Sequence, residues 1–202
     1  MNLRETYNRI AEEWHKDHQQ EDWWVEGTDK FISFLKPGDS VLDVGCGGGT
    51  KYAYLVKKGL RVVGIDFSEK MIEIAKREVP EGTFLVLDLG DVDKLDYLFD
   101  GIFMQAALLH VPKKEVIGKL EKLTKKLKVG GYLYVGVKER KPEGVEEEIK
   151  TEDDYGYPYE RFFSYFTTDE VESYLRKAGL EVVSSEIKPS GNTNWIQVIG
   201  RK

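Results

Sequence analysis

A glycine-rich turn flanked by two aspartates lies early in the chain and has the composition of a ligand-binding site. Residues 41–50 read Val-Leu-Asp-Val-Gly-Cys-Gly-Gly-Gly-Thr, so Asp43 comes shortly before the first glycine. Asp66 ends the next aliphatic run, residues 61–66. Glycines let the backbone turn sharply and let a ligand approach with no Cβ in the way. The order strand, glycine turn, helix, with a carboxylate about 20 residues downstream, predicts a nucleotide-type site in which Asp66 accepts ribose hydroxyls.

The same carboxylates discriminate between two classes of cofactor. A dinucleotide-binding turn reads Gly-x-Gly-x-x-Gly and faces a pyrophosphate, whereas Thr50 stands here at the position of the third glycine. A carboxylate beside the turn would repel a pyrophosphate, but it suits a ligand that carries an ammonium group. S-adenosylmethionine has an amino acid end, a sulfonium and no phosphate, so we expect it as the cofactor. The alternatives are a dinucleotide cofactor and a glycine turn that binds no ligand.

Two segments carry a family resemblance that covers roughly Tyr7 to Lys202. The region from Asp43 to Asp66 resembles motif I and its successor in class I S-adenosylmethionine-dependent methyltransferases. The string Tyr7-Asn-Arg-Ile-Ala11, followed by Trp14, is similar to the Tyr-Asp-x-x-Ala-x-x-Tyr opening of many small prokaryotic members, whose substrates are mostly unassigned. In that family the opening segment packs over the cofactor site as a cap.

The resemblance implies a role for each residue near the cofactor. Asp66 would hold the ribose hydroxyls, Asp88 would reach the adenine amino group, and Phe67 and Met71 would enclose the adenine. Asp43, the turn backbone, Gln105 and Tyr7 would lie at the methionine end. The expected cofactor-binding residues are Tyr7, Asp43, Gly45, Cys46, Gly47, Gly49, Asp66, Phe67, Met71, Asp88, Leu89 and Gln105.

His110 is the candidate catalytic residue, because it follows the fourth predicted strand in the string Gln-Ala-Ala-Leu-Leu-His-Val-Pro. Ligands of open α/β sheets bind beyond the carboxyl ends of the strands. An unperturbed imidazole titrates near pH 6.5, about where a general base is useful. His110 would act as a general base or would position the acceptor, and the alternative is a loop histidine that stabilises the turn before Pro112. His15 and His18 are expected at the surface, and no metal-ligand spacing appears.

The sequence indicates less about the methyl acceptor than about the cofactor. Residues 161–166 and 194–199 are also similar to the tRNA wobble-uridine carboxymethyl methyltransferases, which carry an aromatic-rich segment and a late Asn-Trp. That similarity implies that Arg161, Tyr165, Asn194 and Trp195 lie near the acceptor, although Trp195 could simply pack the last strand onto the sheet. Trp14 of the cap is a further candidate for substrate contact.

Alternating strand and helix patterns position these residues in an α/β, Rossmann-like doubly wound sheet. Strands are expected at 40–44, 61–65, 84–87, 101–104, 132–137, 181–187 and 194–200, and helices at 4–14, 50–58, 69–78, 113–127 and 168–178. The last two strands would form a hairpin, which makes the seventh strand antiparallel. We expect one domain over 1–202, with a helical cap at 1–36 and a loop or lid insertion at 138–166.

Composition narrows the class of protein. The 202 residues carry a net charge of −6, which favours a small-molecule acceptor over the alternative of tRNA. Apolar runs stay below about 18 residues and the N-terminus lacks a signal-peptide stretch, so no membrane span and a cytoplasmic location are expected. The single cysteine, Cys46, allows no internal disulfide. A monomer or a homodimer is expected, and a non-catalytic cofactor-binding module remains an alternative to an enzyme.

Overall fold

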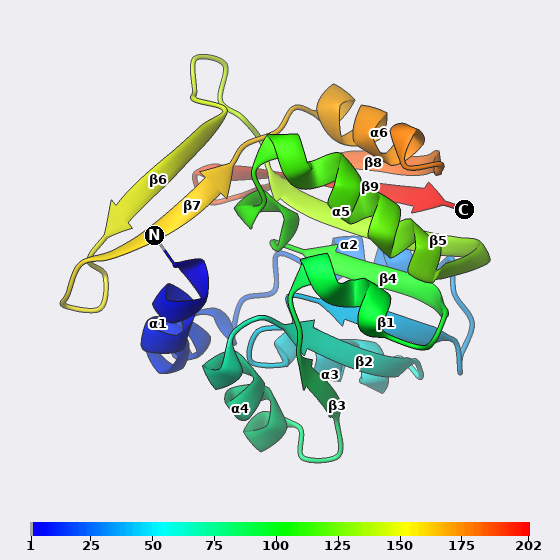
Figure 1. Cartoon of the computed structure of the whole chain (residues 1–202), viewed down its shortest axis with the longest axis horizontal. Helices are drawn as coiled ribbons and strands as arrows, with labels where there is room; N and C mark the ends of the chain where they lie inside the picture. The colour runs from blue at the N-terminus through cyan, green and yellow to red at the C-terminus, as the bar shows by residue number, and fades with distance from the viewer. Residues whose placement is uncertain (1) are drawn as a thin grey trace.

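The computed structural model describes residues 2–202, and its centre is a seven-stranded sheet (Figure 1). The strands are β1 (Ser40–Val44), β2 (Arg61–Asp66), β3 (Thr83–Val86), β4 (Phe99–Gln105), β5 (Leu127–Lys138), β8 (Glu181–Ser190) and β9 (Thr193–Arg201). Their order is β3-β2-β1-β4-β5-β9-β8. The first five strands are parallel, and β9 runs antiparallel to both β5 and β8. The predicted doubly wound sheet with an antiparallel last strand is therefore confirmed.

Helices cover both faces of the sheet. Val116, Leu120 and Leu123 of α5 are buried against the face that α5 and α6 cover, which is the near face in Figure 1. Phe31 of α2 packs against Phe103 on the opposite face. The central strands β1 and β4 are largely apolar on both faces because helices bury both of them. The helices are α2 (Val25–Ile32), α3 (Thr50–Lys57), α4 (Glu69–Glu78), α5 (Lys113–Lys126) and α6 (Thr168–Lys177), with short 3₁₀ turns η1 (Leu89–Lys94) and η2 (Leu108–His110).

The N-terminal helix α1 (Leu3–His18) packs away from the sheet faces, beside α4 and the β6–β7 hairpin described below (Figure 1). Its apolar face places Tyr7 and Ile10 against Ile74 of α4 and Tyr159 of the hairpin. An Asn2 side chain caps its first turn by accepting the Glu5 N–H. None of the helices in residues 2–202 is long and apolar enough to cross a membrane.

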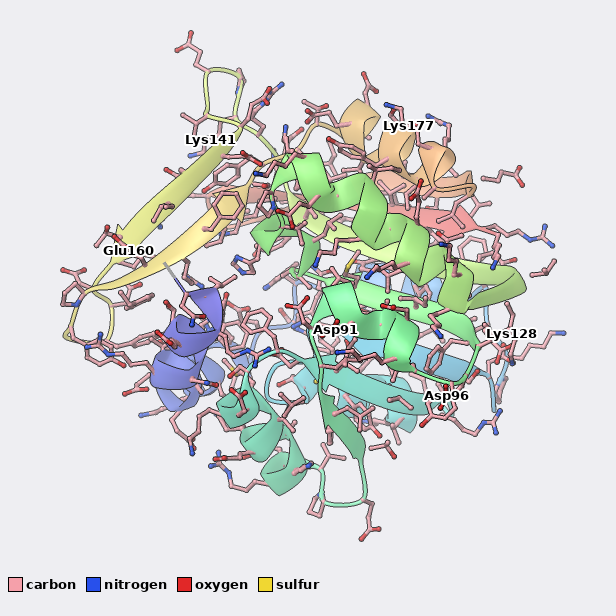
Figure 2. All side chains as sticks on the ribbon, in the orientation of Figure 1. Asp91, Asp96, Lys128, Lys141, Glu160 and Lys177 are labelled. Atoms are coloured by element: carbon pink, nitrogen blue, oxygen red, sulfur yellow. The ribbon has the colours of Figure 1, made fainter. Side chains whose placement is uncertain are left out.

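Residues 138–166, expected as a loop or a partly ordered insertion, contain a two-stranded antiparallel sheet. Its strands are β6 (Glu147–Glu152) and β7 (Tyr159–Ser164). The strand character of β6 is hidden in the sequence by its charges, which are paired across the hairpin: Arg161 binds Glu152 through two nitrogens at 2.6 and 2.8 Å. Side chains alternate along β7, so Glu160 lies on its exposed side (Figure 2) while its neighbours Tyr159 and Arg161 point toward α1.

Candidate active site

Two adjoining cavities lie beyond the carboxyl ends of β1, β2 and β4, where open α/β sheets bind ligands. The first, of about 330 Å³, lies between the glycine turn, α1 and β7. The second, of about 620 Å³, extends toward the segment after β3. Both cavities are bordered by Gly45, Asp66, Phe67 and His110, so these residues stand at their junction.

The glycine turn is held to the neighbouring strand by its backbone. The N–H groups of Gly45 and Cys46 donate to the carbonyl of Ile65 at 2.8 and 3.0 Å. Gly45 has φ +71°, and a Cβ there would lie 2.7 Å from the Ala107 Cβ, so no other residue fits without strain. Gly45, Cys46 and Gly47 line the first cavity, whereas Gly49 is the N-cap of α3 and lies outside it.

Asp66 joins the turn to α4. Its carboxylate accepts the N–H of Gly47 at 3.0 Å and the N–H of Ser68 at 2.9 Å. Burial raises the pKa of Asp66 to about 6, although these backbone N–H groups favour the ionised form. The carboxylate still has lone pairs free for ligand hydroxyls, and its position at the junction of the two cavities suits a ribose.

An acidic and a basic side chain face each other beside the turn. Asp43 is 1% exposed, and its Oδ2 has no hydrogen-bond partner among residues 2–202. Burial raises the pKa of Asp43 and lowers the pKa of Lys51, and each charge opposes the shift of the other. Lys51 lines the first cavity from the first turn of α3. Lys51 was not predicted as a site residue, although its place directly after the glycine turn is a usable signal.

The residues expected around an adenine are divided between the two cavities. Asp88 caps η1 by accepting the Gly90 N–H at 2.6 Å and forms an ion pair with Lys119 at 3.4 Å. Leu89 lines the same cavity, and Phe67 borders both cavities. Met71 is buried and lines only the first cavity. Phe67 and Met71 therefore lie together only at the first cavity, whereas Asp88 lies at the second.

His110 is part of a hydrogen-bonded chain. Its Nδ1 lies 2.7 Å from the carbonyl oxygen of Phe162, which only accepts, so Nδ1 carries the proton. Its Nε2 then accepts the Tyr7 hydroxyl at 2.8 Å. Burial lowers the pKa of His110 to about 3, so the imidazole is neutral at pH 7. The pKa of His110 thus lies well below the value near 6.5 of an unperturbed imidazole, which favours the positioning role over the general base.

Aromatic side chains and two cations form the wall opposite the turn. Trp23 and Trp195 are stacked with ring centroids 4.2 Å apart, and Phe163 of β7 lies on the same cavity. Arg161 and Lys138 also line it. Lys138 and Phe163 were missed, because nothing local in the sequence brings the end of β5 and the hairpin to one place.

The cap contributes more than was expected. Trp14 lines the first cavity and stacks on His18 at 4.3 Å. His15 is 6% exposed beneath the turn, so the expectation that it lies at the surface was wrong. His18 is half-buried at the edge of the same cavity. Gln105 lines the cavity from the end of β4, and its Nε2 has no partner among the described residues.

Two residues expected near the acceptor do not line either cavity. The Tyr165 hydroxyl donates to Glu148 at 2.6 Å. The Asn194 side chain is exposed and donates to Glu139 at 2.8 Å. Within residues 2–202, no group of three or more His, Cys, Asp or Glu side chains is placed to hold a metal ion.

Comparison with known proteins assigns the family. Residues 41–131 match the family described as "Methyltransferase domain". The chain is 32% identical over 169 residues to phosphoethanolamine N-methyltransferase 1 of Zea mays, covering 80% of this chain and 32% of that protein. It is 32% identical over 142 residues to demethylmenaquinone methyltransferase of Symbiobacterium thermophilum, covering 64% of this chain and 56% of that protein. The chain thus spans less than two thirds of the length of either relative.

The fold is shared with solved structures. The Burkholderia thailandensis 1,6-didemethyltoxoflavin-N1-methyltransferase superposes with a TM-score of 0.78 at 21% identity, over 99% of this chain and 87% of that one. At this identity the likeness concerns the fold alone. The domain match, the sheet with its antiparallel β9 and the glycine turn followed by Asp66 agree. The chain therefore belongs to the class I S-adenosylmethionine-dependent methyltransferase family.

Proposed function

We propose that the protein is an enzyme that transfers the methyl group of S-adenosylmethionine to a small-molecule acceptor. The proposal rests on one observation: Asp66 is hydrogen-bonded to the glycine turn and lies at the junction of the two cavities. A carboxylate at that point serves a ligand with vicinal hydroxyls. The opposite charges of Asp43 and Lys51, which interact without forming an ion pair within residues 2–202, suit a zwitterionic amino acid end.

The side chains present fit the whole cofactor. Gln105 Nε2 is a buried polar atom on the first cavity that has no partner within residues 2–202 and that a bound ligand could satisfy. Asp43 Oδ2 also has no partner there, but Asp43 lines neither cavity, so it would act on the ligand through its charge. The methionine part would lie in the first cavity with Tyr7 and Gln105. The adenine would lie in the second cavity with Asp88 and Leu89.

The protein's own contribution to the reaction is binding and alignment. When bound, the cofactor supplies a sulfonium-activated methyl group. The cap residues Tyr7 and Trp14 close the site on one side, which limits water and fixes the approach of the acceptor. The neutral His110 is a weak proton acceptor, so we assign it to positioning: its Nε2, which holds the Tyr7 hydroxyl here, orients an N–H or O–H of the acceptor.

Several observations favour a small molecule over tRNA. Of the four residues expected near a tRNA acceptor, Arg161 and Trp195 line the cavity, whereas Tyr165 and Asn194 are bound elsewhere. The net charge of −6 disfavours nucleic acid. The relatives and the structural neighbour reported above are named for phosphoethanolamine, demethylmenaquinone and 1,6-didemethyltoxoflavin, which are small molecules.

Isothermal titration with S-adenosylmethionine and then S-adenosylhomocysteine tests the proposal. We expect both to bind at about micromolar concentration. A metabolite pool and undermodified tRNA are then offered in parallel with labelled cofactor, and methyl incorporation is followed by mass spectrometry. Binding of neither ligand would refute the cofactor assignment. Binding without transfer to either pool would favour the non-catalytic module.

A further inference from the structure

Lys138, at the end of β5, is a cation that lacks an anionic partner. Its side chain lines the first cavity and is half-buried, and its ammonium forms no hydrogen bond or ion pair within residues 2–202. Nζ lies 4.4 Å from the ring centroid of Phe163 and 5.9 Å from that of Trp195. Burial, with Arg161 and Lys150 nearby, lowers the pKa of Lys138 to about 8, so it remains charged at pH 7.

Arg161 presents a second donor to the same cavity. Its Nε and Nη2 bind the Glu152 carboxylate at 2.6 and 2.8 Å, which fixes the plane of the guanidinium. Within residues 2–202, its Nη1 donates only to the Tyr7 hydroxyl, at 3.5 Å. Glu152 also binds Lys150 at 3.1 Å, so this carboxylate is shared by two other cations. Glu152 and Glu148 act on Lys138 only through longer-range attraction, without an ion pair.

Arg161 has the Glu152 carboxylate as its anion, whereas Lys138 has no ion-pair partner within residues 2–202, so an anionic ligand between the two side chains would relieve the repulsion between them. The surrounding wall is apolar: Phe163 and the stacked pair Trp23 and Trp195. We propose that the methyl acceptor is a small organic oxyanion, a carboxylate or a phosphate ester, bound between Lys138 Nζ and Arg161 Nη1. Its apolar body lies along the aromatic wall. This rests on the proposed function, because it names the substrate class of that site.

The geometry also connects this anion site to the reacting groups. His110 and Tyr7 line the same cavity as Lys138 and Arg161. An acceptor anchored by its anionic group therefore extends past the aromatic wall toward the positioning imidazole. Anchoring at a remote charge contributes binding energy that fixes the orientation of the reacting atom.

Titration with small aromatic probes tests the anion site. Benzoate and phenyl phosphate are the anionic probes and benzamide is the neutral one, followed by tryptophan fluorescence of the full chain saturated with S-adenosylhomocysteine. We expect at least one anionic probe to bind at least about tenfold more tightly than benzamide, because one charge-assisted hydrogen bond contributes about that much. The two probes separate a carboxylate-selective from a phosphate-selective site, and a preference for either supports the proposal.

Variants assign the preference to Lys138. Lys138→Met should abolish it and Lys138→Arg should keep it. Lys141→Met removes the same charge from the exposed loop before β6 (Figure 2) and should behave as the wild type. The proposal is overturned if the wild type binds benzamide as well as both anions, or if Lys138→Met keeps the preference. If Lys138→Met has a lower Tm than the wild type, Lys138→Gln is used in its place. The comparison of the anionic probes with benzamide in the wild type tests the proposal in either case.

A separate titration distinguishes failure of the anion site from failure of the proposed cofactor binding. S-adenosylhomocysteine is titrated into the same samples without probe. Binding of S-adenosylhomocysteine without an anion preference refutes only the anion site. An anion preference in a protein that binds no S-adenosylhomocysteine refutes only the cofactor assignment.

Discussion

Replacing Asp66 by alanine should abolish cofactor binding while leaving the free protein nearly as stable at pH 8. The N–H groups of Gly47 and Ser68 lose their acceptor, which costs about 1–3 kcal/mol for a donor that stays buried and less where water from the cavity reaches it. The ionised carboxylate of the wild type has the opposite effect on stability, because its removal stabilises the fold. Burial raises its pKa from 3.8 to about 6, which corresponds to about 3 kcal/mol of destabilisation at pH 8. The two effects have opposite sign and similar size.

The pH dependence separates these effects. A carboxyl group whose pKa is raised in the fold stabilises most below the unfolded value of 3.8, and that stabilisation is lost as pH rises through about 6. The wild type should therefore lose about 2 kcal/mol relative to Asp66→Ala between pH 4.5 and pH 8. Urea unfolding at the two pH values measures this difference. Asp96→Ala, at an exposed position after η1 (Figure 2), is the matched control and should show no such change.

Calorimetry measures the binding side of the same substitution. Loss of two charge-assisted hydrogen bonds to ribose hydroxyls should weaken S-adenosylhomocysteine binding by about 100-fold or more at pH 8. Asp96→Ala should bind as the wild type does. Unaltered affinity in Asp66→Ala would refute the placement of the ribose, and a stability difference independent of pH would refute the account of its buried carboxylate.

Three further substitutions test the positioning group, the turn and a helix cap. His110→Gln should lower turnover by about tenfold or more with S-adenosylhomocysteine affinity retained, and full activity would make His110 a loop residue. Because burial lowers its pKa to about 3, His110 should contribute no acidic limb near pH 6.5 to the profile of kcat/KM, and a limb that disappears in the variant would contradict this. Gly45→Ala should lower both Tm and S-adenosylhomocysteine affinity, since its Cβ would lie 2.7 Å from that of Ala107; wild-type values would show that the turn adapts. Thr167→Ala removes the acceptor of the Glu170 N–H and should lower Tm by about 3 °C, so an unchanged Tm would deny the capping box a role.

The sheet and the turn could be predicted from the sequence because their signals are local. Strands buried on both faces read as continuous aliphatic runs, and the run that ends at Val44 passes directly into the glycines. Positions at the carboxyl ends of consecutive parallel strands share one edge of the sheet. This is why Asp66 and His110, which are far apart in the chain, were expected at one site and border the same cavities.

The acceptor side could not be predicted in the same way, because its residues meet only through tertiary structure. Lys138 and Phe163 belong to different sheets, and the hairpin that carries Phe163 was hidden by its charged strand β6. Neighbouring residues on a strand point to opposite faces, so of Asn194 and Trp195 only one could face the cavity. Tyr165 stacks beside Phe163 with ring centroids 6.2 Å apart, but its hydroxyl is held by Glu148 and its side chain does not line the cavity.

The polarity of His15 led to the wrong prediction that it is exposed, whereas its helical spacing predicts that it is buried. Tyr7, Ala11, Trp14, His15 and His18 recur at helical spacing and form one face of α1. The period alone predicts that His15 is buried, and a Cβ at Gly48 would overlap its imidazole. Gly48 therefore lacks a side chain because the cap packs against the turn there, and not because its backbone needs a positive φ. The glycines of this turn thus serve two partners, the ligand and the helix that covers it.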